Sequence, residues 1–241
     1  MTMPVHPVPL AADLAGKPDL PRKSSLLREP SLLRKPSLRG VSHEVAFYVS
    51  LVAGPALVWA APAGRAVGAT LVYTVCLAAL FGLSALYHRP TWQPVARQRM
   101  RRLDHAGIFF QIAGTYTPVC LLALDPATGQ PLLTYVWAAA AFGMVKSVWW
   151  VHAPKPVTAG LYLAMSWAIV AQWSAVADGL GPRGMALLIG GGVLYSVGAV
   201  IYARRWPDPR PAAFGYHEIF HLLVVLAAGC HFEMVRAIVM R

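Results

Sequence analysis

The 241-residue chain is 57% hydrophobic and only 13% charged, whereas ordinary soluble domains carry about 25% charged residues. These proportions exclude a typical soluble globular domain and indicate a protein whose main solvent is lipid. The net charge of +11 does not indicate a nucleic-acid partner, because the basic residues lie in the N-terminal segment and between apolar stretches, where anionic lipid headgroups are nearer.

Residues 1–40 differ from the rest of the chain because they are rich in proline and basic residues. Residues 25–30 read SLLREP, residues 31–36 read SLLRKP, and residues 37–39 read SLR. A proline every six residues prevents a long helix. We therefore expect residues 1–40 to form a disordered basic tail and residues 41–241 to form a membrane domain.

Seven apolar spans follow the tail, each close to the roughly 20 residues that a helix needs to cross a bilayer. Backbone groups in lipid need internal partners, so these spans should be helices. The expected fold is an all-α, seven-transmembrane helix bundle. The three cysteines fall inside apolar stretches and should be unpaired packing residues. The spans are 42–61, 66–87, 104–124, 132–152, 157–177, 183–203 and 216–238.

The distribution of Lys and Arg predicts the orientation of the bundle. With seven spans, 17 of these residues fall on the side of the N-terminus and 4 on the other side. The N-terminus should therefore lie in the cytosol and the C-terminus outside. The four residues on the outer side are Arg65, Arg183, Arg236 and Arg241.

Ionisable residues inside membrane spans are costly and usually functional. Ser84 and His88 close the second span, and His217 and His221 open the seventh. Each pair is four residues apart and shares one helix face. All four residues should lie at the cytosolic edge. Three neutral imidazoles are typical of a catalytic zinc site with one open position, so we expect His88, His217 and His221 to bind Zn²⁺.

Asp104 opens the third span at the same expected depth. It shares a helix face with Gln111 and Thr115, which suits a helix facing the bundle interior. Its carboxylate is a candidate general base, with Ser84 beside it as a second catalytic candidate. The alternative is that Asp104 only caps the third helix, because carboxylates favour helix N-termini.

The remaining histidines are expected outside the zinc site. His43 and His152 should be interfacial, and His105 should point about 100° away from Asp104. His231 lies 14 residues after His217, or about 21 Å along a helix. It should form an interhelical hydrogen bond deeper in the bundle.

Residues 217–221 also match the H-E-x-x-H pattern of zinc proteases, in which Glu218 would be the general base. The pattern is short, a third histidine lies outside it, and seven spans leave no soluble domain to hold a peptide. A protease is therefore the least favoured alternative.

Several motifs together resemble the hemolysin III family, which is related to the progestin and adipoQ receptors and more distantly to alkaline ceramidases. They are GVSHEVAFYV at 40–49, SALYH at 84–88, LDH at 103–105, IAGTYTP at 112–118 and YHEIFH at 216–221. The resemblance covers residues 40–241. It implies seven helices, a cytosolic N-terminus and location in a bacterial plasma membrane. It also implies a zinc ion on His88, His217 and His221, with Asp104 and Ser84 matching the family's aspartate and serine.

Three functions remain open. The resemblance implies a zinc-dependent, ceramidase-like hydrolase of a lipid amide or ester, for which membrane lipids are the expected partners and substrates. The second is a non-enzymatic lipid sensor or regulator. The third is a hemolysin-type cytolysin, although the strongest polar residues cluster at one end of the bundle, which disfavours a pore.

Overall fold

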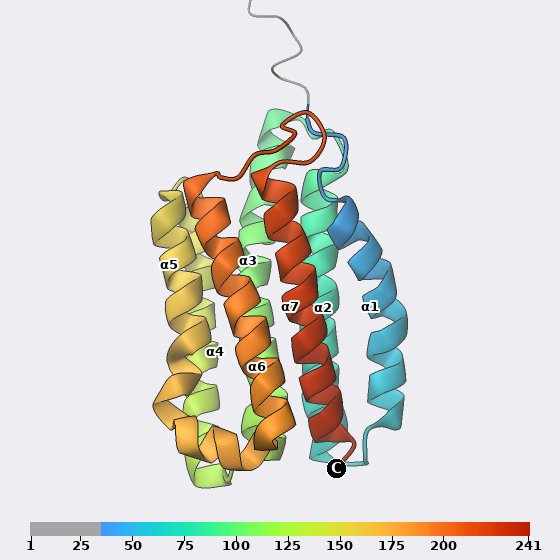
Figure 1. Cartoon of the computed structure of the whole chain (residues 1–241), viewed down its shortest axis with the longest axis vertical. Coiled ribbons are helices and arrows are strands. Elements are labelled where there is room, and N and C mark those ends of the chain that lie inside the picture. Colours follow the sequence, from blue (N-terminus) through green and yellow to red (C-terminus); the bar gives the residue numbers. More distant parts are fainter. Residues whose placement is uncertain (1–34) are drawn as a thin grey trace, which may run out of the picture. The chain divides into compact units, whose positions relative to one another are not determined.

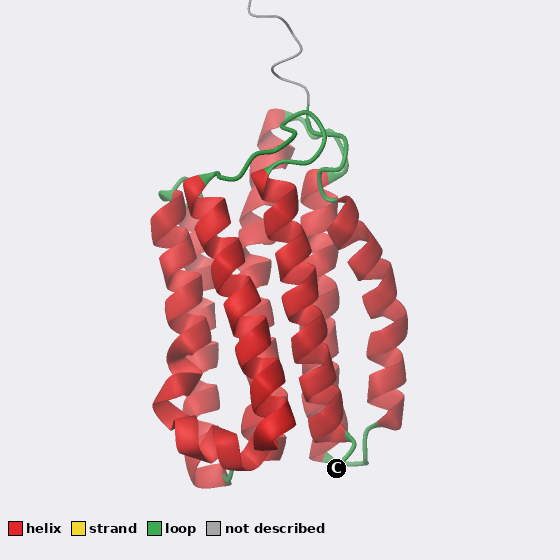
Figure 2. Cartoon of the chain, viewed as in Figure 1, coloured by secondary structure: helices red, strands yellow, loops and turns green. Residues whose placement is uncertain are grey.

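The computed structural model describes residues 35–241, and this part consists of helices joined by loops, with no β-strand (Figure 2). A single isolated bridge pairs Arg210 with Phe214. The helices are α1 (Val41–Ala60), α2 (Arg65–His88), α3 (Pro94–Pro118), α4 (Pro126–Trp149), α5 (Lys155–Ser166), α6 (Trp173–Arg204) and α7 (Tyr216–Val239). A π-helical turn, η3 (Val119–Ala123), extends α3, and a 3₁₀ turn, η4 (Trp167–Gln172), joins α5 to α6.

The helices run side by side along one axis (Figure 1). The most extensive contacts join α6 to α7, α2 to α3, α1 to α2 and α3 to α4. Helix α7 also touches α1, α2 and α3, so the last helix lies against the first three. This arrangement places the end of α2 and the start of α7 at the same end of the bundle.

Six helical stretches among the described residues are long and apolar enough to cross a membrane. One of them, Lys155–Arg204, is 50 residues long and contains α5, η4 and α6. Its helical geometry breaks at Gly181, where φ is 67°.

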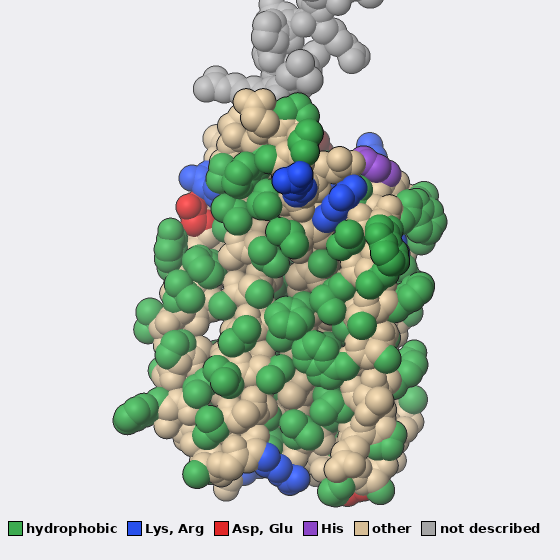
Figure 3. All heavy atoms as spheres, turned by 180° about the vertical axis from the view of Figure 1, so that it is seen from behind, with side chains coloured by type: hydrophobic (Ala, Val, Ile, Leu, Met, Phe, Trp, Pro, Cys, Tyr) green, Lys and Arg blue, Asp and Glu red, His purple; other side chains and the backbone are tan. Residues whose placement is uncertain are grey.

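The outer wall of the bundle is apolar, as a lipid-facing surface should be: Trp59, Val52 and Phe142 are 92%, 74% and 68% exposed. Figure 3 shows hydrophobic side chains over the middle of one face, with Lys and Arg near the two ends.

Two helix starts differ from the sequence prediction. Helix α3 begins at Pro94 rather than residue 104, and α4 begins at Pro126 rather than residue 132. Both begin with proline, which suits the first position of a helix. Asp125 caps α4 by accepting hydrogen bonds from the N–H groups of Ala127 (2.9 Å) and Thr128 (3.1 Å), and the bonds from Thr128 lower its pKa. A search for apolar stretches misses polar first turns of this kind.

The cysteines are free, and Cys76 and Cys120 are buried, as predicted for packing residues. Cys76 marks a close approach of α2 and α3: a Cβ added to Gly114 would lie 2.4 Å from Cys76 Cβ. Small residues at such contacts let helix backbones approach closely.

Residues 35–40, here called the N-terminal strap, lie against the helical bundle although we assigned them to the tail. The N–H of Ser37 donates to Ala212 O (3.2 Å), and the N–H of Leu38 donates to Ala213 O (3.3 Å). Figure 1 shows the strap in blue beside the red loop that leads to α7. Residues 1–34, which contain most of the predicted tail, lie outside the described residues.

Candidate metal centre

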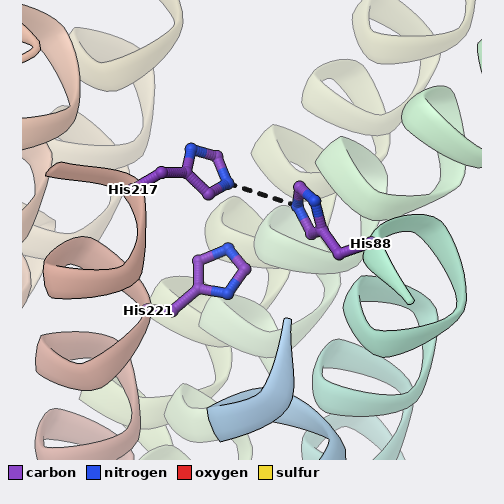
Figure 4. Close-up of side chains that lie close together, drawn as sticks. All are labelled: His88, His217 and His221. Atoms are coloured by element: carbon purple, nitrogen blue, oxygen red, sulfur yellow. Dashed lines mark hydrogen bonds between the residues drawn. The ribbon is translucent and has the colours of Figure 1, made fainter. Parts of the chain in front are cut away.

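Three histidines from two helices meet at one end of the bundle. His88 is the last residue of α2, while His217 and His221 lie in the first two turns of α7. Because the α7 pair is four residues apart, both rings project from one helix face and point toward His88 (Figure 4). One ligand nitrogen from each ring lies within 4.8 Å of the others, and the Nε2 atoms of His217 and His88 are 3.2 Å apart.

The environment of these rings suits a metal ion. His88 and His221 are buried, with 7% and 2% exposure. Among residues 35–241, His221 Nδ1 is buried without any hydrogen-bond partner. Buried polar atoms normally have partners, and a metal would satisfy such nitrogens. Three imidazoles are a donor set that zinc accepts readily, so the residues present fit a zinc ion.

Asp104 and Ser84 lie beside the histidines. Asp104 Oδ2 is 3.9 Å from His88 Nε2, and its side chain is 13% exposed. Ser84 lies one turn before His88 on α2 and is 3% exposed. The alternative role of Asp104 as a helix cap is wrong, because α3 begins at Pro94 and its N-cap is Gln93. Asp104 is therefore a carboxylate inside a helix, next to the cluster.

The three histidines, Ser84 and Asp104 share the wall of a cavity of about 280 Å³. Away from the cluster the wall is largely apolar and extends to Trp173, Val176 and His231. Gln111 and Thr115 also line it, and Gln111 Nε2 donates to Thr115 Oγ1 at 3.1 Å. The predicted polar stripe of α3 thus faces the interior.

Glu218 stands apart from this cavity although it lies between two of the histidines in sequence. Its carboxylate is 3% exposed and forms an ion pair with Arg39. Its Oε2 accepts the N–H of Gly215 at 2.8 Å. Within the described part of the chain, Glu218 is not among the residues that line the cavity. The arrangement therefore differs from a protease site, where this glutamate would face the metal.

His43 is the residue that the sequence analysis missed. We expected it at the interface, but it is 3% exposed. Its ring stacks on that of His221, with centroids 3.9 Å apart and planes inclined by 8°. Neither of its ring nitrogens has a partner among residues 35–241. His43 lies in the first turn of α1, at the same end of the bundle as the other site residues. This position in the sequence could have indicated that it lies beside the cluster.

The other histidines among residues 35–241 lie outside the cluster. His152 is exposed, and its Nε2 lies 3.1 Å from Gln98 Nε2. His105 lines the cavity without joining the metal cluster. His231 Nε2 lies 3.2 Å from Leu188 O on α6, which confirms the predicted interhelical hydrogen bond.

Comparison with known proteins places the chain in a family. A family model described as "Haemolysin-III related" matches residues 32–232. "Hemolysin-3" of Bacillus cereus is 34% identical over 160 residues, which cover 66% of this chain and 70% of that protein. "Hemolysin-3 homolog" of Bacillus subtilis is 30% identical over 198 residues, which cover 80% of this chain and 88% of that protein.

A more distant relative is "Adiponectin receptor protein" of Drosophila melanogaster, which is 29% identical over 177 residues. This match covers 66% of the chain but 39% of the receptor. The family match, its bacterial relatives and the apolar helical stretches lead to one conclusion. The chain belongs to the haemolysin-III family and is an integral, multi-pass membrane protein.

Proposed function

We propose that this protein crosses the membrane seven times, with its N-terminus in the cytosol and its C-terminus outside. We also propose that it binds one zinc ion through His88, His217 and His221 and hydrolyses a lipid amide or ester. The break at Gly181 supports two crossings within Lys155–Arg204, and the bias of Lys and Arg supports the orientation.

One observation carries the proposed activity: three imidazoles and a carboxylate meet at the polar end of a largely apolar cavity. Zinc supplies Lewis-acid polarisation of a carbonyl group or of water when bound to such a site. The apolar wall beyond the cluster would hold a hydrocarbon chain, and the polar end would then face the amide or ester group. This division of the cavity favours a lipid substrate over a peptide.

Asp104 and Ser84 have separate roles in this proposal. The Asp104 carboxylate, next to His88 and facing the cavity, accepts the proton of the attacking water at Oδ2 and returns it to the leaving group. The Ser84 hydroxyl donates a hydrogen bond to the carbonyl oxygen as negative charge develops there. Both side chains are held by long helices, which keeps their positions fixed.

A second candidate function, cytolysis, comes from the names of the bacterial relatives, which are hemolysins. A pore needs polar groups along its whole length, whereas the cavity wall here is mostly apolar below the histidine cluster. A non-enzymatic lipid regulator would use the same cavity and metal without turnover. The experiment below separates it from the hydrolase.

The test combines metal analysis with lipid analysis of cells that express each variant. Purified wild-type protein should contain about one zinc per chain, and the double variant His217→Ala plus His221→Ala should contain none. Asp104→Asn should retain zinc but change the cellular lipid profile in the same way as the double variant. His152→Ala, which alters an exposed histidine, is the matched control and should behave as wild type.

Two results would count against the proposal. Unchanged zinc in the double variant would remove the metal site. A wild-type lipid profile in a folded, zinc-bearing Asp104→Asn variant would make Asp104 structural and favour the regulator over the hydrolase.

A further inference from the structure

The N-terminal strap reaches the end of α2 directly. Lys35 Nζ donates to the carbonyl oxygen of Arg89 at 2.8 Å, and Arg89 is the residue that follows His88. Gly40 adopts a φ of 80°, and a Cβ added there would lie 2.6 Å from His88 Cβ. The backbone of the strap therefore rests against the histidine that α2 contributes to the cluster.

The same strap also reaches the start of α7. Its backbone bonds to Ala212 and Ala213 hold the loop that leads into this helix. The side chain of Arg39 goes further and pairs with the buried carboxylate of Glu218 in the first turn of α7. One six-residue segment thus joins the two helices that carry the three clustered histidines.

Both carboxylate oxygens of Glu218 are engaged. Oε1 receives the Arg39 guanidinium, and Oε2 receives the N–H of Gly215 at 2.8 Å. The next N–H, that of Tyr216, donates to Asp208 Oδ1 at 3.0 Å. The first turn of α7 is therefore held by fixed partners, because a buried carboxylate that loses its cation is costly.

We propose that Arg39 and Glu218 are positioning residues for the metal centre. Glu218 lies on α7 between His217 and His221 but points away from the cavity, toward the strap. Any rotation of the first turn of α7 that moves His217 away from His88 also pulls Glu218 away from Arg39. The ion pair thereby fixes the angular position of α7 and the spacing of the imidazoles. This inference rests on the proposed zinc site, and it gives the glutamate of the H-E-x-x-H segment a role without proton transfer.

The test measures metal affinity rather than activity. Zn²⁺ and Co²⁺ are titrated against a competing chelator into purified protein that carries Arg39→Gln, Glu218→Gln or both changes. Each single variant should bind about 10–100-fold more weakly, as expected when partners outside the ligand set are lost. The visible absorption spectrum of bound Co²⁺ should also shift. The double variant should bind the metal about as tightly as the single variant with the lower affinity. The two effects should not add, because both residues act through one contact.

Arg183→Gln is the matched control, because Arg183 pairs with Glu233 (2.9 Å) near the other end of α7. It should leave both the affinity and the cobalt spectrum unchanged. The proposal is overturned if Arg39→Gln melts at the same temperature as this control and keeps wild-type affinity and spectrum. If Arg39→Gln does not fold, the same measurements on Glu218→Gln test the proposal. This variant removes the buried charge and keeps an acceptor for the N–H of Gly215. A wild-type protein that binds neither ion would instead overturn the zinc site itself.

Discussion

At the scale of single residues, the stacked pair of His43 and His221 sets the local shape of the cluster. The edge of Phe81 meets the His43 ring, with centroids 5.2 Å apart and planes inclined by 69°. His43 therefore lies between an aromatic side chain and a candidate metal ligand. Because its nitrogens have no partner within the described residues, the flat ring itself is the feature that holds His221.

This arrangement predicts different results for two substitutions of His43. His43→Phe keeps a flat ring against His221 and should retain zinc. His43→Ala removes the stack and leaves a cavity. It should lower both the melting temperature and the zinc content, since a cavity in a packed core lowers the free energy of unfolding by roughly a few kcal/mol. Metal analysis and thermal unfolding in detergent measure both effects. If His43→Phe loses zinc as completely as His221→Ala, a nitrogen of His43 is a ligand.

Helical spacing and position at the ends of the membrane spans were enough to predict that His88, His217, His221 and Asp104 form one site. Both depend on sequence alone, because residues four apart share a helix face and the ends of spans share a membrane surface. The burial of His43 and the pairing of Glu218 with Arg39 depend on which helices and loops become neighbours. Helical spacing and hydropathy along the sequence do not show which helices and loops those are.

At the scale of elements, the break in α6 has its own cap. Gly181 has a φ of 67°, and the Arg241 guanidinium donates to the carbonyl oxygens of Gly179 and Leu180 just before it. Carbonyl groups at a helix end need such donors. The sequence predicted the start of the sixth span at residue 183, and Pro182 directly follows the break. The starts of α3 and α4 were not predicted, because their first turns lie outside the apolar stretches.

We expect Gly181→Ala to destabilise the protein. A Cβ there would meet only Arg241, at 3.9 Å, so the cost comes from the backbone conformation. Its φ of 67° and ψ of 176° lie in a region that is almost exclusive to glycine, where another residue costs about 1–3 kcal/mol. Gly190→Ala is the control, because its Cβ would meet nothing within 4 Å and its φ is not positive. It should be neutral or slightly stabilising. Unfolding by a denaturing detergent measures the difference, and equal stability of the two variants would contradict the prediction.

At the scale of the whole molecule, the distribution of basic residues supports the proposed orientation. The end of the bundle that carries the histidines also carries Lys35, Arg39, Arg89 and Lys155. The other end carries Arg183, Arg236 and Arg241 on or beside the end of α7. The composition predicted the helical membrane fold because few other structures satisfy the backbone in lipid.

The orientation predicts which ends of the chain are accessible in intact cells. A tag at the C-terminus should react with an impermeant reagent from outside, and a tag at the N-terminus should react only after the cells are opened. The seven proposed crossings would place the ends on opposite sides, and the excess of basic residues on the N-terminal side favours the cytosol for that side. A protected C-terminal tag together with an exposed N-terminal tag would reverse the orientation.

The distance along the chain between the clustered histidines has a consequence for biosynthesis. His88 and His217 are 129 residues apart in sequence, and Arg39 and Glu218 are 179 residues apart. The first three helices therefore enter the membrane carrying Ser84, His88 and Asp104 long before the ribosome has made their partners. Synthesis of α7 completes the cluster and closes the strap in the same step. Uptake of the proposed zinc ion would thus report that the last helix has inserted, and a chain that stalls before α7 lacks two of the three imidazoles.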